Sequence, residues 1–525
     1  MRSFGFDGSS HPIPEEIMRR TSLPSGLTFR ENVGYGLGDA AANFVFMTMI
    51  LFQTNFYTDV FGLTAGSAAV VLLIARAWDA VADPLIGFLA DRTQTRWGKF
   101  RPWILATAAP WALLMILAYT TPSGLSSEEM FFYAVLTNAL LMSVYSMNNV
   151  PYTALGSVLT ADTEERTKLN ALRFIAVNLA QLVVGGLTLP LVAKFSTGHS
   201  RQYGWRSTMS LWALVCLILF LITFFTTRER VHTQPKRDTK VVQDVISLFR
   251  SSPWLVVLGI TMVNFLLLSF RGAALYDYYH YYADTASAYR FLHDLGLTTP
   301  SAHSIRSGFL GFLDTLGYVV HNDAHGAGYS NVADVFNSLI NVINTGVTIL
   351  ILLISPALSR KFGKKTVSTL GFGLAGLLTV VRYVVEPANV AGMLVFTVAI
   401  TVAYAPTIPL TWAMYADVAD YCELSTGRRC AGMAFAGVGL TLKLGLALGS
   451  SLFLWIMLAA FDYDAADPWA PEALHGFRIA SSLITGALLL LCALLVGFYK
   501  LDRTATRRMT DELILRRAQL EPGAS

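Results

Sequence analysis

Charged residues are scarce in this chain of 525 residues. Only 14% are Asp, Glu, Lys or Arg, against roughly 25% in an ordinary soluble domain, while 54% are hydrophobic. The mean hydropathy of +0.50 cannot come from a single anchor, because one span takes only about 20 residues. Most of the chain is therefore expected to cross a lipid bilayer many times. The net charge of +4 provides no strongly basic surface, so no nucleic-acid partner is expected.

Motifs for catalysis, metal binding and secretion are also absent. None of the four cysteines stands in a C-x-x-C pair, and we find no nucleophile–base set, H-E-x-x-H or G-x-S-x-G. Neither enzymatic activity nor a cofactor or bound metal is expected. His321 and His325 in HNDAH would form half a metal site on a helix, but without a third ligand a solvated lid is the stronger interpretation. The polar N-terminus has no apolar stretch of a secretory signal.

Apolar stretches of spanning length recur along the chain and predict an all-α membrane protein with twelve transmembrane helices. Their ranges are 35–59, 64–90, 102–121, 130–158, 169–194, 208–227, 252–276, 332–358, 366–386, 391–418, 430–460 and 476–499. A polar, basic linker divides them into two sets of six, as in transporters built from two rocking bundles. The predicted organisation is a cytoplasmic segment 1–34, a six-helix bundle 35–227, a linker 228–251, a second bundle 252–500 with an extracytoplasmic insertion 277–330, and a cytoplasmic tail 501–525.

Basic residues gather in alternate loops. The loops at 91–101 and 360–365, the linker and the tail are rich in Lys and Arg, while most opposite loops lack them; Arg201 and Arg206 are exceptions. By the positive-inside rule both termini are cytoplasmic. Two termini on one side require an even number of spans, which agrees with twelve.

The second predicted span carries three charges on one face. Arg76, Asp79 and Asp83 are spaced so that the two carboxylates lie one helical turn apart. Ionised groups at this depth are costly unless they are paired, hydrated or protonated. Two acids at this spacing repel, so one of them holds a proton or recruits a cation. A coupling site is predicted; a charge network in which Arg76 holds helices together is a compatible alternative.

A set of motifs makes the sequence recognisable. They are YGLGD (35–39), FYTDVFGL (56–63), ARAWDAVADP (75–84), TRWGKFRPW (95–103), ERTKLNALRF (165–174), ADVADYCE (416–423) and TLKLG (441–445). In this order they resemble the glycoside-pentoside-hexuronide:cation symporter family of the major facilitator superfamily, over nearly the whole chain apart from the insertion. The resemblance implies two six-helix bundles in a bacterial inner membrane. It also implies symport of a sugar with H⁺ or Na⁺ by alternating access.

The resemblance implies a coupling-cation site built on Asp79 and Asp83, with the hydroxyl of Ser146 as a further oxygen ligand. The sequence departs from the melibiose-permease pattern of the family at Ala82, where that pattern has Asn. Na⁺ needs several oxygen ligands, and alanine supplies none from its side chain. A proton needs one carboxylate, so H⁺ is favoured over Na⁺ as the coupling ion.

The implied sugar site shows a second departure. Asn43 and Asn149 stand where the family pattern has two acids, and Arg173 and Lys443 match cationic positions near the pocket. An amide still pairs with hydroxyls but suits different partners, and a positive lining would also accommodate a carboxylated sugar such as a hexuronide. Lys443, a lone ammonium in an apolar helix, has an alternative role as counter-ion to the acids of the second span.

Tyrosines near these positions are further candidates, because aromatic rings stack on sugar rings. Tyr145 and Tyr152 are predicted to contact the substrate, and Tyr276 and Tyr279 are predicted pocket or vestibule residues. For each one, helix packing or an interfacial belt is the alternative. A lipid or lysolipid carrier of the same fold and a non-transporting sugar sensor are the alternative functions. The polar Asn and Tyr face argues against the first, and the paired carboxylates argue against the second.

Overall fold

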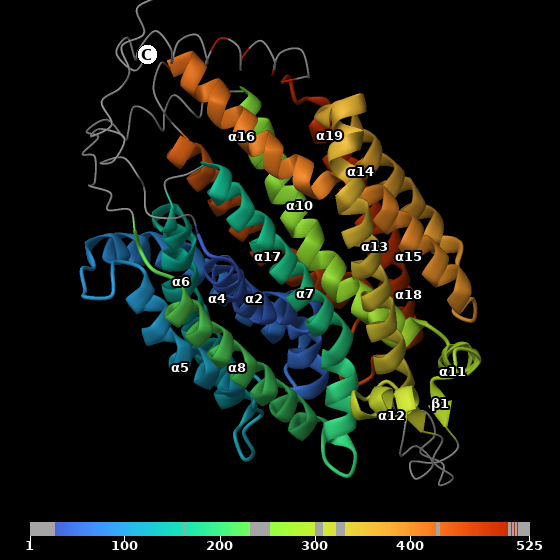
Figure 1. Cartoon of the computed structure of the whole chain (residues 1–525). Coiled ribbons are helices and arrows are strands. Elements are labelled where there is room, and N and C mark those ends of the chain that lie inside the picture. The colour runs from blue at the N-terminus through green and yellow to red at the C-terminus, as the bar shows by residue number, and fades with distance from the viewer. Residues whose placement is uncertain are drawn as a thin grey trace, which may run out of the picture.

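The structure, a computed structural model, is almost entirely helical (Figure 1). It describes residues 27–160, 163–230, 252–299, 308–321, 331–426, 431–501, 506, 509 and 512. The elements of the first half are α2 (Phe29–Leu51), α3 (Gln53–Asn55), η1 (Phe56–Val60), α4 (Ala65–Arg92), α5 (Arg101–Ala118), α6 (Ser127–Leu159), α7 (Thr163–Ser196) and α8 (Arg201–Thr226). The second half contains α10 (Ser252–Asp277), η2 (Tyr278–Tyr282), α11 (Thr285–Asp294), β1 (Thr298–Thr299), α12 (Gly308–Thr315), β2 (Val320–His321), α13 (Val332–Phe362), α14 (Lys364–Val381), η3 (Arg382–Val384), α15 (Val390–Tyr404), α16 (Thr407–Thr426), α17 (Ala431–Phe461), α18 (Pro471–Ile479), η4 (Ala480–Ile484) and α19 (Thr485–Gly497).

Every predicted span corresponds to a helix. Among the described residues, however, 10 helices, fewer than the predicted twelve, are long and apolar enough to cross a membrane. The pair formed by α2 and the α3–η1 segment, bent by 61°, would be the eleventh. The expected second span, α4, is not among them, although its 28 residues exceed the about 20 that a span requires. This is the helix that carries Arg76, Asp79 and Asp83.

Several helices begin earlier than the apolar stretches indicate, and two of them do so at a capping box. The first and fourth spans were expected from residues 35 and 130, but α2 begins at Phe29 and α6 at Ser127. In each, the residue before the helix forms a capping box: Thr28 with Glu31, and Ser126 with Glu129. These boxes satisfy the free N–H groups of the first turn, so the helix extends beyond its apolar part.

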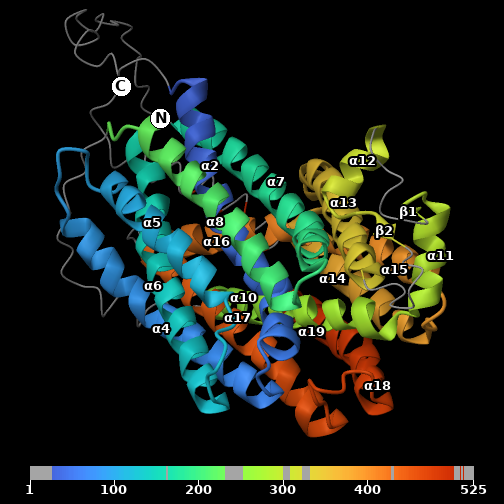
Figure 2. The same cartoon turned by 90° about the horizontal axis from the view of Figure 1, so that it is seen from below.

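In Figures 1 and 2, α4, α5, α6 and α8 of the first half lie on one side and α13, α14 and α15 of the second half lie on the other. The halves meet where α17 packs on α4, α7 packs on α13 and α10 packs on α2. We call the end of the bundle at which α2 ends and α8 begins the distal end. The helices that pack against one another between the halves therefore include α2, α4, α7, α10, α13 and α17.

The segment between η2 and α13 forms a small unit at the distal end (lower right of Figure 1). Strands β1 and β2 pair in parallel within it. The hydroxyl of Tyr318 donates a hydrogen bond of 2.6 Å to the carbonyl of Gly186 in α7, so this unit of the second half is tied to the first. His321 lies in β2 rather than on a helix, which removes the helical spacing considered for HNDAH, and His325 lies outside the described residues.

Candidate functional site

Side chains from three helices meet at the acids of α4. Asp79 is 3% exposed, and the hydroxyl of Ser146 in α6 donates a hydrogen bond of 2.6 Å to its Oδ1. Lys443 in α17 places its Nζ 3.0 Å from Asp79 Oδ2 and also forms an ion pair with Asp83. The structure thus brings together all three predicted cation-site residues and one predicted substrate residue. Because α17 belongs to the second half and α4 to the first, this cluster also joins the two halves.

The two acids are not equivalent. The side chain of Asp83 is 29% exposed, whereas that of Asp79 is 4% exposed. Asp83 Oδ1 is buried and has no hydrogen-bond partner among the described residues. Two carboxylates therefore share one ammonium, and the more accessible acid keeps an unused oxygen. Such an oxygen can accept a proton or ligate a small cation, and either would offset the repulsion between the acids.

Among the described residues, Arg76 does not form the ion pairs that the predicted charge network would require. It forms no salt bridge with either acid in the described part of the chain, although Asp79 is the strongest opposite charge that acts on it. The ion-pair partner of both acids is Lys443. Lys443 thus has the position of a counter-ion to the two acids, the alternative role given for it above, and Arg76 is outside this set of ion pairs.

Arg173 and Asn43 form a second polar cluster between α2 and α7. Arg173 Nε lies 2.8 Å from a carboxylate oxygen of Asp39. The amide of Asn43 donates to the backbone carbonyl of Asp39 at 2.9 Å, and Gln181 donates to Asn43 Oδ1 at 3.3 Å. The charge of Arg173 is thus neutralised by an acid to which the sequence analysis assigned no role.

The predicted substrate residues of α6 differ in their surroundings. Tyr152 is 1% exposed, its hydroxyl donates to the carbonyl of Tyr35 at 2.6 Å, and its ring stacks on Tyr35 at 4.7 Å. It therefore packs α6 against α2. Tyr145 is half-buried beside Trp111, with ring centroids 5.4 Å apart. Asn149 is half-buried as well, and its side chain makes no hydrogen bond to a described residue.

A cavity lies between α2 and α7 of the first half and α10, α13 and α15 of the second. Its empty space is about 1110 Å³ with the mouth included. Tyr276 and Tyr279, the predicted vestibule residues, line it. Gln181 lines it too and links it to Asn43. None of the residues predicted to bind the substrate lines this cavity: Asn43, Tyr145, Asn149, Tyr152, Arg173 and Lys443.

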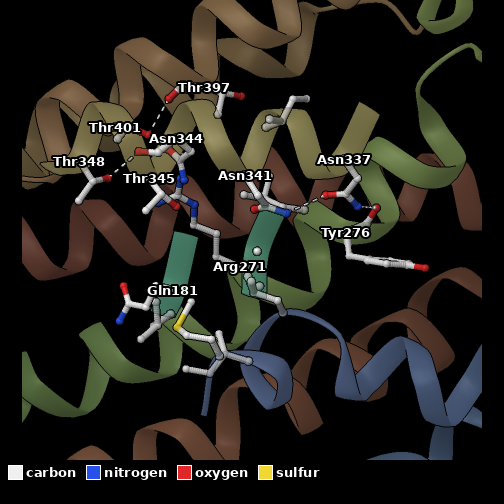
Figure 3. A pocket seen from close by; sticks show the side chains of 18 of the residues that line it. Gln181, Arg271, Tyr276, Asn337, Asn341, Asn344, Thr345, Thr348, Thr397 and Thr401 are labelled. Carbon is white, nitrogen blue, oxygen red and sulfur yellow. Dashed lines mark hydrogen bonds between the residues drawn. The ribbon is translucent and has the colours of Figure 1, made fainter. Parts of the chain in front are cut away.

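One wall of this cavity is rich in amides and hydroxyls, as Figure 3 shows. Its polar residues on α13 and α15 are Asn337, Asn341, Asn344, Thr345, Thr348, Thr397, Thr401 and Tyr404. Several bond to one another: Asn341 donates to Asn337 Oδ1 at 3.2 Å, and Thr401 donates to Asn344. Amides and hydroxyls donate and accept, which matches the hydroxyl groups of a sugar. This wall was not among the predicted site residues, although its polar residues on α13 are spaced along one helical face.

Polar contacts also join the halves at the distal end. Both terminal nitrogens of Arg201 lie 2.9 Å from Asp334 oxygens, and the Asp334 side chain is 1% exposed. Nearby, Asn55 donates to the carboxylate of Asp277. Arg201, an exception to the positive-inside pattern, is thus held by an acid of the opposite half. The distal end is closed in this conformation.

Buried ion pairs beside a polar cavity, in a bundle with many spans, are features that secondary transporters require. The sequence matches the family described as MFS/sugar transport protein over residues 34–302 and 309–503. The inner membrane symporter YicJ of Escherichia coli (strain K12) is 32% identical over 493 residues, which are 93% of this chain and 95% of that protein. The putative glycoside/cation symporter YagG of the same organism is 31% identical over 494 residues, 94% of this chain and 96% of that protein.

Among solved structures, the D-xylose-proton symporter has a TM-score of 0.57 at 15% identity and covers 89% of this chain and 97% of its own, which shows the shared fold. The chain belongs to the MFS/sugar transport protein family and is a multi-pass membrane protein. The predicted resemblance to the glycoside-pentoside-hexuronide:cation symporters is confirmed, and with it the predicted class of function, cation-coupled sugar transport.

Proposed function

We propose that this protein carries a sugar into the cell together with a proton, by alternating access. The protein would lie in a bacterial inner membrane with both termini in the cytoplasm, and the distal end would face outward. The observation that supports this proposal is the shared ammonium of Lys443, which leaves two carboxylates with one ion-pair partner among the described residues and Asp83 with an unused oxygen. A proton on Asp83 would balance the cluster without further ligands.

Proton coupling is favoured over Na⁺ by the few oxygen atoms around the acids. Ser146 supplies one hydroxyl oxygen, which donates its proton to Asp79 and keeps its lone pairs for a ligand. Ala82, the residue before Asp83, supplies no side-chain oxygen. A proton needs one acceptor, whereas Na⁺ would need a larger set of oxygens. Alkalinisation of the medium during sugar uptake in Na⁺-free vesicles would support proton coupling, and uptake that depends on Na⁺ would contradict it.

The coupling role is tested with Asp83→Asn in membrane vesicles. The amide keeps the size of the side chain but cannot take up a proton, so uphill accumulation of the sugar should be lost. Exchange of labelled for unlabelled sugar should persist, because it requires no net movement of the cation. Glu128→Gln, at an exposed position in the first turn of α6, is the matched control. Uphill accumulation at the wild-type level in Asp83→Asn would refute the assignment.

The polar wall of the cavity supports a hydroxyl-rich ligand. Amide and hydroxyl side chains of α13 and α15 face the apolar residues Ile50 and Leu51 of α2 across the cavity. A sugar presents hydroxyls on its edge and C–H groups on its faces, so it can use both walls. An acyl chain would leave the amide wall without hydrogen-bond partners, which is unfavourable.

A further inference from the structure

The cavity wall carries one positive charge. Arg271 of α10 is the cation among the described lining residues, and no Asp or Glu is found among them. Its guanidinium lies over the ring of Tyr404, 5.7 Å from the centroid, and it forms no salt bridge with a described residue. Figure 3 shows its side chain extending from α10 into the space beside the α13 amides.

Arg271 differs in this respect from Arg173, Arg201 and Lys443. Arg173 contacts Asp39, Lys443 contacts the acids of α4, and Arg201 contacts Asp334. The charged side chain that acts on Arg271 is Arg382, a second cation. A guanidinium at membrane depth is costly without a counter-charge, so one with no acid beside it is a functional candidate.

We propose that Arg271 binds a carboxylate or sulfonate carried by the transported sugar, so that the substrate is an acidic sugar. This inference rests on the proposed function and names its substrate class. A guanidinium presents paired N–H donors that fit two oxygens of one anionic group. The neighbouring amides of α13 then take the hydroxyls of the same ring. Arg173 and Lys443, the cations predicted near the sugar site, are paired with acids of the protein, whereas Arg271 lines the cavity with no acid beside it among the described residues.

The test compares pairs of sugars that differ at one group: a phenyl glucuronide and the matching phenyl glucoside, and a 6-sulfonated sugar and its 6-hydroxyl parent. Initial uptake is measured in vesicles for the wild type, Arg271→Gln, Arg271→Lys and the control Arg206→Gln, whose side chain is exposed at the distal end. In the wild type the acidic member of one pair should be preferred. A hydrogen bond to a charged group is worth enough that Arg271→Gln should lower this preference about 10- to 100-fold, and Arg271→Lys should restore part of it. The two pairs distinguish a carboxylate from a sulfonate.

Thermal stabilisation of the purified wild-type protein by each sugar provides a second readout that does not depend on any variant folding. The acidic sugar should stabilise at a lower concentration than its neutral partner, and added salt should reduce the difference. Equal use of acidic and neutral sugars by the wild type, or an unchanged preference in Arg271→Gln, would overturn the inference and leave proton-coupled sugar transport standing. Uphill accumulation that survives Asp83→Asn would instead overturn the proposed function.

Discussion

The ion pair between Arg201 and Asp334 should hold the distal end closed. Asp334→Asn removes the negative charge and one of the two hydrogen bonds, both of 2.9 Å, and leaves the guanidinium without its acid. Breaking a buried pair by removing one partner costs about 3–5 kcal/mol. The cost falls on the closed state, because the two residues lie on opposite halves and must separate when this end opens. The Arg201 side chain is 32% exposed and can be hydrated, so the cost should lie near the lower end of this range. At about 1.4 kcal/mol per tenfold change, the population should then shift toward the distal-open state about 100-fold.

Spin labels report this shift directly. Cysteines introduced at Thr197 and Ala388, which are exposed in distal loops of the two halves, would be labelled and their distance distribution measured by pulsed electron spin resonance. The distance should be short in the wild type and in Arg206→Gln, and a longer distance should dominate in Asp334→Asn. The double variant Arg201→Gln/Asp334→Asn should shift less than the single one, since it leaves no buried unpaired charge. An unchanged distance distribution in Asp334→Asn would refute the reasoning.

Two further variants test the contacts between helices. Lys443→Ala removes the ammonium that competes with the coupling cation for the acids of α4. The cation concentration that gives half-maximal uptake should therefore fall. An unchanged or higher concentration would contradict the ion-pair geometry. Gly38→Ala would place a methyl group 2.5 Å from the ring of Tyr152 and should destabilise the protein by about 1–3 kcal/mol in thermal unfolding. Gly346→Ala, which meets nothing within 4 Å, is the control, and equal melting of the two variants would contradict the packing of α6 on α2.

Much of this architecture could be predicted from the sequence, because spans and loop charges are local patterns. The position of the acids on one face of α4 follows from their spacing alone. Their pairing with Lys443 could be offered only as an alternative, since nothing in the sequence sets the distance between α4 and α17. The neutralisation of Arg173 by Asp39 was missed for the same reason. Contacts between distant segments depend on packing, which a single sequence does not record.

The cavity, in contrast, could have been predicted, because the polar residues that line it form a pattern visible in the sequence. Asn337, Asn341, Asn344 and Thr348 recur at three- and four-residue intervals within an apolar span, which places them on one helical face. Arg271 likewise interrupts the predicted span 252–276. A polar stripe in a membrane helix must face protein or water, so both features indicated an internal surface. Most of the family motifs lie in the first half, whereas the polar wall lies mostly in the second.

The two charged contacts between the halves act at different depths, and this difference suggests how coupling would work. Arg201 and Asp334 lie at the distal end, whereas Lys443 meets the acids of α4 near the middle of their helices. A proton on Asp83 would weaken the attraction between α17 and α4 without touching the distal pair. An acidic sugar at Arg271 would add a negative charge to the cavity at the same time, so that the loaded protein gains one charge of each sign. Reorientation of that complex moves no net charge from the ligands, and reorientation with either ligand alone does. Under the proposed function, an acidic sugar and one proton should therefore be carried together without generating a current, and a current during uptake would require a second coupling ion or a neutral substrate.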